Sequence, residues 1–386
     1  MMKRRRAVVI LSPLNLRRLA RGLAPWVARG WEFVPVPLDR PVESILRLIS
    51  GQKADGVLVE FDIDLVESVF AFGKPTVVLF ADLIVDGAVC VNVDDYAVGQ
   101  LAAQHLLERG LRRFAYCGRA TMHAPERMRG YRDSLREAGL TVSVFEEATA
   151  AAGAAGPVWQ EPSARLQKWL QGLAVPCGIF AAHDSLGRTL AEGAARIGRR
   201  IPDDIAILSA SDDALVCEMA EPPLSCVALP WERIADAAAG WLDRLVSGKA
   251  APEDPVRITP TTVITRASTE VIAVGDPLVE RALRHARDNL RSLQSVDQWV
   301  RALGTNRRQL ERTFRAATRE SPYSALIRLR VLRARDYLIQ TDASLVDIAE
   351  LCGFSRPEKL SHHFRRVTGE PPSKVRRRER RVVEVR

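Results

Sequence analysis

Short apolar segments alternate with amphipathic segments along the first 270 residues of this 386-residue chain. The apolar segments are rich in β-branched and aromatic side chains, which favours strands, and the segments between them have helical periodicity. The expected strands are 7–11, 31–37, 56–61, 75–80, 88–93, 113–118, 177–182, 205–210 and 225–229. The expected helices are 14–29, 41–51, 95–109, 126–139, 161–172, 184–198 and 231–247. Nearly continuous apolar strands that alternate with helices predict parallel sheets covered on both faces.

A region of this length is too long for one small sheet, so we expect two doubly wound α/β lobes. In such sheets ligands bind at the carboxyl ends of the strands, so residues 1–270 are expected to form a two-lobed α/β domain that binds a ligand. Residues 148–157, which are rich in Ala and Gly, are expected to form a loop or surface connection. Residues 271–277 are expected to be a linker.

The chain has no apolar run near the length of about 20 residues that spans a bilayer. Its start, MMKRRRAVVIL, holds one five-residue apolar run before Ser12, which predicts a strand. The apolar region of a signal peptide is longer, about 7–15 residues. The six cysteines show no CxxC pair and no metal-ligand spacing, which is typical of small buried hydrophobic residues. We therefore expect a cytoplasmic protein with no membrane partner, no disulfide framework, no metal and no cofactor.

One pattern occurs twice in the last part of the chain. SVDQWVRALGTNRRQLERTF at 295–314 aligns with SLVDIAELCGFSRPEKLSHHF at 344–364. Each copy has an apolar helix, a glycine turn, a residue able to cap the next helix, and then Leu and Phe four apart. The caps are Asn306 and Ser355, and the apolar pairs are Leu310 with Phe314 and Leu360 with Phe364. This pattern predicts an all-α domain at 278–386, with helix-turn-helix motifs at about 295–316 and about 344–368 and a linking helix at about 322–340.

The charge of the chain is divided unevenly between these two parts. Residues 277–386 hold 25 Lys and Arg against 13 Asp and Glu, a net charge of +12, whereas the rest of the chain has a net charge of −3. A basic helical unit on a slightly acidic body indicates a polyanion partner, and a solvated basic surface is the alternative. In a helix-turn-helix the second helix enters the major groove, so its polar face should reach base edges and phosphates.

The candidate DNA contacts lie at outward positions of the two expected second helices. They are Arg307, Arg308, Glu311 and Arg312 in the first copy, and Glu358, Lys359 and His362 in the second. A carboxylate is repelled by phosphate, so it is tolerated best where it accepts from a cytosine amine. The alternative for Glu311 is an ion pair with Arg307 or Arg315, one turn away on the same helix.

Residues 278–377 resemble the DNA-binding domain of the AraC/XylS family of transcription regulators. The resemblance is carried by the twin turns and by RLRVLRARDYL, IAELCGF and F…TGEPPSKVR. It implies two helix-turn-helix units that read successive major grooves on one face of promoter DNA. By position, the residues that face the bases are Arg308, Glu311, Arg312, Glu358, Lys359 and His362. The sequence departs from the family pattern at Arg319, where Gly usually ends the first reading helix, at Thr305-Asn306 and at Val375-Arg376.

Charged side chains follow several of the expected strands in the first 270 residues. Carboxylates and an arginine at the carboxyl ends of parallel strands converge on one cleft and suit the adjacent hydroxyls of a sugar. Helix N-capping is the alternative for each Asp, and we expect Asp95 and Asp184 to cap. An aromatic ring, Phe61 or Phe80, would stack on a sugar face.

The same stretches resemble the effector domain of the LacI/GalR regulators, here without their amino-terminal DNA-binding headpiece. The resemblance implies that residues 1–270 form a periplasmic-binding-protein-like effector domain. By position, the resemblance implies four ligand contacts, Asp94, Arg127, His183 and Asp212. Glu60, Phe61 and Asp62 follow another strand that is expected to face the same cleft.

An effector domain of this kind ahead of an AraC-type reader resembles the regulators of xylose use. It implies a homodimeric transcription activator controlled by xylose or a related monosaccharide, with RNA polymerase as a further partner. An enzyme is the second hypothesis, but the chain has no GxxxxGK[ST] loop and no GxSxG motif, so we expect none. A DNA-binding regulator whose sensor domain binds a non-sugar ligand, or none, is the third.

Overall fold

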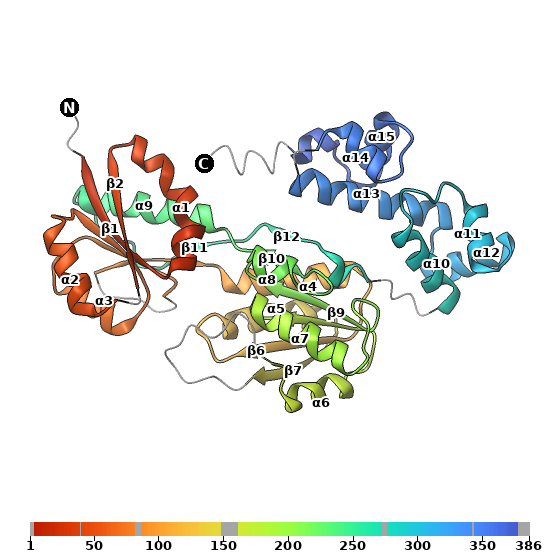
Figure 1. Cartoon of the computed structure of the whole chain (residues 1–386), viewed down its shortest axis with the longest axis horizontal. Coiled ribbons are helices and arrows are strands. Elements are labelled where there is room, and N and C mark those ends of the chain that lie inside the picture. The colour runs from red at the N-terminus through yellow and green to blue at the C-terminus, as the bar shows by residue number, and fades with distance from the viewer. Residues whose placement is uncertain are drawn as a thin grey trace.

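The computed structural model describes residues 4–38, 40–81, 87–147, 161–271, 276–341 and 343–376 (Figure 1). Residues 4–271 form two α/β lobes and residues 276–376 form a helical unit. The loop expected at 148–157 lies outside the described residues, and so does the 272–275 part of the expected linker. Within the described ranges, no helix combines the length and the apolar character needed to cross a membrane.

The first lobe is a six-stranded parallel sheet with strand order β11-β5-β4-β3-β1-β2. Its strands are β1 (Arg5–Leu11), β2 (Trp31–Pro37), β3 (Gly56–Glu60), β4 (Thr76–Leu79), β5 (Val89–Val93) and β11 (Val256–Ile258). Its helices are α1 (Pro13–Ala28), α2 (Val42–Gly51), α3 (Ile63–Phe70) and α9 (Trp231–Val246). Alternate residues of β1 enter two cores: Val9 and Leu11 pack with α1 and α9, and Val8 and Ile10 pack with α2 and α3. The sheet is therefore covered on both faces, as its continuous apolar strands predict.

The second lobe is a six-stranded sheet with strand order β12-β10-β9-β8-β6-β7. Its strands are β6 (Phe114–Arg119), β7 (Val142–Glu147), β8 (Cys177–Ala181), β9 (Ile205–Ala210), β10 (Ser225–Ala228) and β12 (Thr262–Ile264). Its helices are α4 (Asp95–Glu108), α5 (Ala124–Glu137), α6 (Ala164–Gly172), α7 (Asp184–Arg196), α8 (Ala214–Glu218) and the 3-10 turn η1 (Ala267–Thr269). The sheet is not wholly parallel, because β12 pairs antiparallel with β10. The chain leaves β10 for the first lobe and returns from β11 across the same edge of the second sheet, so β12 runs opposite to β10.

The chain crosses between the lobes three times within residues 4–271: after β5, after β10 and after β11. Each crossing leaves a sheet at the carboxyl end of a strand: β5 and β11 are parallel to their neighbours, and β10 is parallel to β9. The carboxyl ends of the parallel strands in each sheet are therefore directed toward the other lobe (Figure 1). This is the edge at which ligands bind in open α/β sheets.

The helical unit is built around one long helix, α13 (Pro322–Gln340), which Figure 1 shows running between two groups of helices. The first group is α10 (Pro277–Asp288), α11 (Val296–Leu303) and α12 (Arg307–Thr318), and the second is α14 (Leu345–Leu351) and α15 (Pro357–Thr368). Ala325 and Leu326 of α13 join the core of the first group, while Val331 and Ala334 join that of the second. Two helix-turn-helix units thus share one helix.

The two turns are closed by glycines in the left-handed conformation, Gly304 with φ +62° and Gly353 with φ +76°. Asn306 caps α12 through a bond from the N–H of Gln309 to its Oδ1 (2.8 Å), as the pattern predicts. The expected cap at Ser355 is wrong. Pro357 takes the first helical position of α15, so the cap position falls on Arg356, whose side chain makes no capping bond.

Candidate functional site

Arg127, a predicted ligand contact, is buried inside the second lobe and is 2% exposed. Its Nε donates to Oδ1 of Asp95 (2.7 Å) and its Nη1 donates to the carbonyl of Ala182 (2.6 Å). Nδ1 of His123 lies 3.2 Å from the other Asp95 oxygen. Burial by itself would raise the pKa of Asp95, but the Arg127 charge and the His123 hydrogen bond outweigh it and hold that pKa below its ordinary value. Asp95 anchors Arg127, and the expectation that Asp95 caps a helix is wrong.

Asp94 is the residue that caps α4, at the first crossing between the lobes. Its Oδ1 accepts from the N–H of Ala97 (3.0 Å). Its Oδ2 accepts from the hydroxyl of Thr259 (3.4 Å), and its own N–H donates to the carbonyl of Ile258 (3.0 Å). These bonds tie the first crossing to the third, so Asp94 has a structural task beside the predicted ligand contact.

His183 follows β8 and is an uncharged hydrogen-bonding group. Its Nε2 lies 3.1 Å from the hydroxyl oxygen of Thr121. Burial, and then the charge of Arg127, lowers the pKa of His183 to about 3, so the imidazole is neutral near pH 7. A neutral imidazole donates at one nitrogen and accepts at the other, which suits a hydroxyl-bearing ligand.

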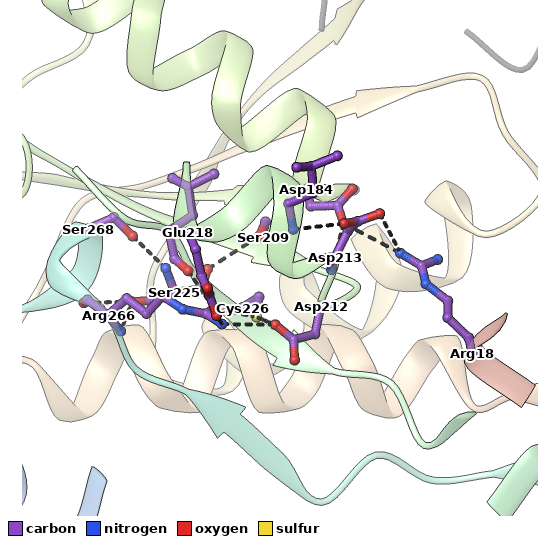
Figure 2. Close-up of polar contacts among 12 residues, drawn as sticks. Arg18, Asp184, Ser209, Asp212, Asp213, Glu218, Ser225, Cys226, Arg266 and Ser268 are labelled. Atoms are coloured by element: carbon purple, nitrogen blue, oxygen red, sulfur yellow. Dashed lines mark hydrogen bonds and ion pairs between the residues drawn. The ribbon is translucent and has the colours of Figure 1, made fainter. Parts of the chain in front are cut away.

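A group of charges that the sequence analysis did not single out as a set joins the two lobes (Figure 2). Nη2 of Arg18, on α1, lies 3.3 Å from Oδ2 of Asp213 and 3.9 Å from Oδ2 of Asp184. Its Cζ stands 4.7 Å from the ring centroid of Trp231, the first residue of α9. Phe80 packs edge-on against the same indole, with 5.8 Å between ring centroids. Burial raises the pKa of Asp184, and the Arg18 charge offsets part of that rise.

Asp184 does not cap α7 as expected, because His183 takes the cap position. Oδ1 of Asp184 accepts from the N–H of the next residue, Ser185 (2.8 Å), and Oδ2 accepts from the N–H of Asp213 (3.1 Å). Asp213 itself caps α8, since its Oδ1 accepts from the N–H of Leu215 (3.0 Å). These bonds hold the two carboxylates in fixed positions relative to each other without any contribution from Arg18.

Asp212 faces a different group from its neighbour Asp213, as Figure 2 shows. Its Oδ1 accepts from Nη2 of Arg266 (3.2 Å) and lies 3.2 Å from Sγ of Cys226. The guanidinium of Arg266 also donates to the carbonyl of Leu224 (2.9 Å). The two successive aspartates after β9 therefore point to separate networks, one with Arg266 and the other with Arg18.

Asp212, Cys217 and Cys226 place one ligand atom each within 4.8 Å of one another, as a metal site would. Nη1 of Arg266 lies 3.3 Å from Sγ of Cys226, so a positive charge already faces this set. A hydrogen bond with Cys217, and then burial, raise the pKa of Cys226 well above its ordinary value. A protonated Cys226 thiol beside a guanidinium disfavours a bound cation. All six cysteines are buried, as predicted, and none of them forms a disulfide.

The other predicted ligand residues lie at the end of β3 in the first lobe. Oε2 of Glu60 accepts from the N–H of Ser12 (2.7 Å), and its Oε1 accepts from the side chain of Asn15 (2.9 Å). Asp62 caps α3 by accepting from the N–H of Leu65 (3.1 Å). Phe61 is half-buried and packs on the core shared with α2 and α3. Glu60 therefore holds the β1–α1 turn, and its role toward a ligand stays a prediction.

On both second helices the apolar residues are buried and the predicted DNA contacts point outward. Leu310, Phe314, Leu360 and Phe364 are each 0% exposed. Six of the seven predicted contact residues are exposed and Glu311 is half-buried; the six are Arg307, Arg308, Arg312, Glu358, Lys359 and His362. This arrangement leaves one polar, mainly basic face on each helix, as DNA recognition requires.

Glu311 pairs with Arg307 on the same helix, with 3.0 Å between Oε1 and Nε. Arg307 also reaches Asp297 on α11 (3.2 Å). In the DNA-free chain Glu311 therefore forms the ion pair with Arg307 that was the alternative to a base contact. Arg308 and Arg312 form no ion pair with any residue that the structure describes, so their charges are available to a partner.

Arg330, a functional residue that the sequence analysis missed, fixes the two helix-turn-helix units to each other. It lies on α13 and is 5% exposed. Its guanidinium donates to the carbonyl of Leu290 (2.9 and 3.1 Å) and to that of Leu293 (2.8 Å), in the segment before α11. The same group lies 5.7 Å from the ring centroid of Phe354, in the turn before α15. The signal available in the sequence was an arginine four residues after Leu326, where the helical repeat calls for an apolar residue.

The helical unit docks on the second lobe through charged contacts. Arg333 of α13 pairs with Glu270 (3.2 Å), and Arg284 and Arg287 of α10 lie 3.7 and 3.9 Å from Asp203. Burial, and then the charge of Glu270, raises the pKa of Asp336 on α13 to about 7. Through Glu270 and Arg333, the effector domain is in direct contact with the linking helix α13.

Two protein families match separate parts of the chain. The periplasmic binding protein-like domain family matches residues 103–269, and the helix-turn-helix domain family matches residues 299–378. The xylose operon regulatory protein of Escherichia coli (strain K12) is 24% identical over 97% of this chain and 98% of its own length. The HTH-type transcriptional regulator CelR of Thermobifida fusca is 31% identical over 60% of this chain and 68% of its own.

Two solved structures share the fold. That of the xylose-binding transcription activator xylR has a TM-score of 0.66 and 23% identity, and covers 97% of this chain and 98% of that chain. That of the transcriptional regulator CelR in complex with cellobiose has a TM-score of 0.55 and 26% identity, and covers 69% of this chain and 86% of that chain. The first similarity runs through both parts of the chain, whereas the second covers about the length of the two lobes.

Proposed function

Because this chain belongs to the AraC/XylS-type transcription regulators that carry a LacI/GalR-like effector domain, we propose that a small sugar bound between its lobes controls its grip on promoter DNA. One observation carries the proposal: a two-lobed domain of the sugar-binding type and two helix-turn-helix units with outward basic faces stand in one chain. The same order of parts extends over nearly the whole length of a xylose operon regulatory protein.

The effector in this proposal is an uncharged monosaccharide, with xylose or another pentose first. Two relatives support an uncharged sugar: one is named for the xylose operon, a pentose system, and a structure of the other holds cellobiose, a disaccharide. Carboxylates, a neutral imidazole and an indole ring at the strand ends are the groups that sugar hydroxyls and sugar faces require. The predicted contacts are Glu60, Phe61, Asp62, Asp94, Arg127, His183 and Asp212.

On DNA, the outward residues of α12 and α15 would enter successive major grooves. Arg308 and Arg312 are the leading base contacts in the first unit, because they have no ion pair to break within the described part of the chain. Glu358, Lys359 and His362 would serve the second unit. We expect two copies of the chain on adjacent sites in the cytoplasm, activation through RNA polymerase and no catalytic activity.

A panel of sugars tests the effector proposal by thermal shift on the full chain. The panel holds xylose, arabinose, ribose, glucose, galactose and cellobiose, and the hit then enters footprinting on promoter fragments. A ligand at a hundred times its Kd should stabilise the folded chain by about 2.7 kcal/mol. No shift with any sugar, together with footprints that no sugar alters, would leave the chain as a DNA binder with a different effector or none.

A further inference from the structure

The ion pairs of Arg18 reach from one lobe to the other without passing through the three crossing segments. Arg18 lies on α1 of the first lobe, while Asp184 and Asp213 open α7 and α8 of the second. The side chains of the three residues are 16%, 13% and 19% exposed. The contact is therefore largely sheltered from water, where an ion pair is screened less than at a free surface.

The length of this contact depends on how the lobes are placed. An opening of the lobes by a few ångströms would carry Arg18 away from both carboxylates, because the two aspartates are fixed to each other through the Asp213 N–H. Separating two charges costs much free energy when they stay buried and unpaired, and little when water can hydrate them as they part. The arrangement therefore links lobe position to an electrostatic interaction.

The surroundings of Arg18 match those of a ligand-binding group. Its guanidinium lies against the indole of Trp231, and Nε1 of that indole is buried without a hydrogen-bond partner among the described residues. Asp184 follows His183, one of the predicted sugar contacts. A buried donor that lacks an acceptor is uncommon in folded proteins and indicates a position where a ligand or water oxygen would be bound.

We infer that Arg18 is the lobe-joining cation of the effector site, and that its pairs with Asp213 and Asp184 hold the lobes closed over an uncharged polyol. The inference rests on the proposed function and adds to it the residue that senses closure. One guanidinium faces two carboxylates, which leaves a net negative charge, so the site disfavours a sugar phosphate or a sugar acid. Arg18 is a positioning residue here: it acts through the lobe arrangement and through Asp213.

Interlobe distance in the sugar-free chain tests the closure part directly. Spin labels on Val27→Cys of α1 and Gln171→Cys of α6 report the distance between lobes, and the native cysteines are buried. Arg18→Ala should lengthen and broaden the distance distribution, Arg18→Lys should restore part of it, and the exposed neighbour Arg17→Ala should leave it as in the parent. An unchanged distribution in Arg18→Ala overturns the inference, whatever the sugar panel gives.

Affinity for the sugar from the panel tests the pairing with Asp213. Asp213→Asn removes the charge but keeps an oxygen able to cap α8. Arg18→Ala and Asp213→Asn should each weaken binding by about tenfold, and the double variant should be no weaker than either single variant. High salt should weaken binding in the parent more than in Arg18→Ala. Additive losses with equal salt dependence would overturn the pairing, and tighter binding of the matching sugar phosphate would overturn the charge preference.

Discussion

Gly353 and Arg330 are packed so closely that a methyl group on Gly353 would stand 2.6 Å from Nη2 of Arg330. The same methyl group would stand 2.2 Å from the carbonyl oxygen of Leu290, which accepts from that guanidinium. The turn of the second helix-turn-helix, the linking helix and the segment before the first helix-turn-helix therefore meet at one point. This contact therefore helps to fix the position of α12 relative to α15, the second helices of the two helix-turn-helix units.

Gly353→Ala should destabilise the helical unit more than a substitution that changes only backbone strain. The comparison is Gly304→Ala, since Gly304 is also left-handed (φ +62°) but has nothing within 4 Å of the added methyl group. Gly304→Ala should cost about 1–2 kcal/mol of unfolding free energy, and Gly353→Ala should cost about 1–3 kcal/mol more, as overpacking does. Urea unfolding of the full chain measures both, and equal losses would contradict the proposed close contact.

Arg312→Ala should weaken binding to the specific operator by about 1–3 kcal/mol and binding to random DNA by less, because a base contact carries sequence information. Arg307→Ala is the matched variant on the same helix, since Arg307 is already paired with Glu311 and Asp297. Arg307→Ala should lose less binding free energy on the operator than Arg312→Ala does. Competition binding at fixed salt gives both numbers, and equal losses on both DNAs would assign Arg312 to phosphate.

Asp212→Ala should abolish the sugar-induced shift in Tm while DNA affinity without sugar is retained. Asp212 is a predicted contact, and its removal also leaves Arg266 without its nearer carboxylate. Glu218→Ala is the control, because Glu218 lies farther from the same guanidinium (3.7 Å) and its side chain is 64% exposed. A full sugar response in Asp212→Ala would remove Asp212 from the site.

The free energy of unfolding of the chain should fall as pH rises from 5 to 8. Burial and Glu270 raise the pKa of Asp336 to about 7 in the folded chain, above the ordinary value of about 3.9. Since the folded-state pKa is the higher one, the stabilisation is complete below about pH 4 and is lost as pH rises through about 7. Arg333, Arg109 and Arg335 face the same carboxyl and oppose this shift.

Asp336→Asn keeps the shape of the neutral acid, so its Tm should fall less between pH 5 and 8 than that of the parent chain. Asp288→Asn, on the exposed end of α10, is the control and should follow the parent. Parallel Tm profiles for the parent and Asp336→Asn would show that Asp336 does not titrate in this range.

Much of the fold could be predicted from local pattern. Strands and helices of the lobes follow from apolar runs and periodicity, and their observed bounds lie within three residues of the expected ones. The elements missing from the prediction, α3, β7 and α8 among them, are short, with five to eight residues each. Arg319 has φ +61° where its counterpart is Gly369 (φ +78°), so the departure from the family pattern is a strained position in this chain.

The candidate site could be predicted only in part. Strand ends are visible in a sequence, and among the charged residues found there the resemblance to the LacI/GalR effector domain singled out Asp94, His183 and Asp212. Which way each side chain turns is not visible, and the successive residues Asp212 and Asp213 serve two different arginines. Arg18 had no local signal, because it sits inside an amphipathic helix.

The sequence by itself determined two α/β lobes, a doubled helix-turn-helix and a basic tail, because hydrophobic periodicity, glycine turns and net charge are properties of neighbouring residues. Only the tertiary structure decided that Asp95 holds Arg127, that Arg18 joins the lobes and that Arg330 joins the reading helices. Those contacts form between elements that are far apart along the chain, and their partners are chosen by how the sheets and helices pack.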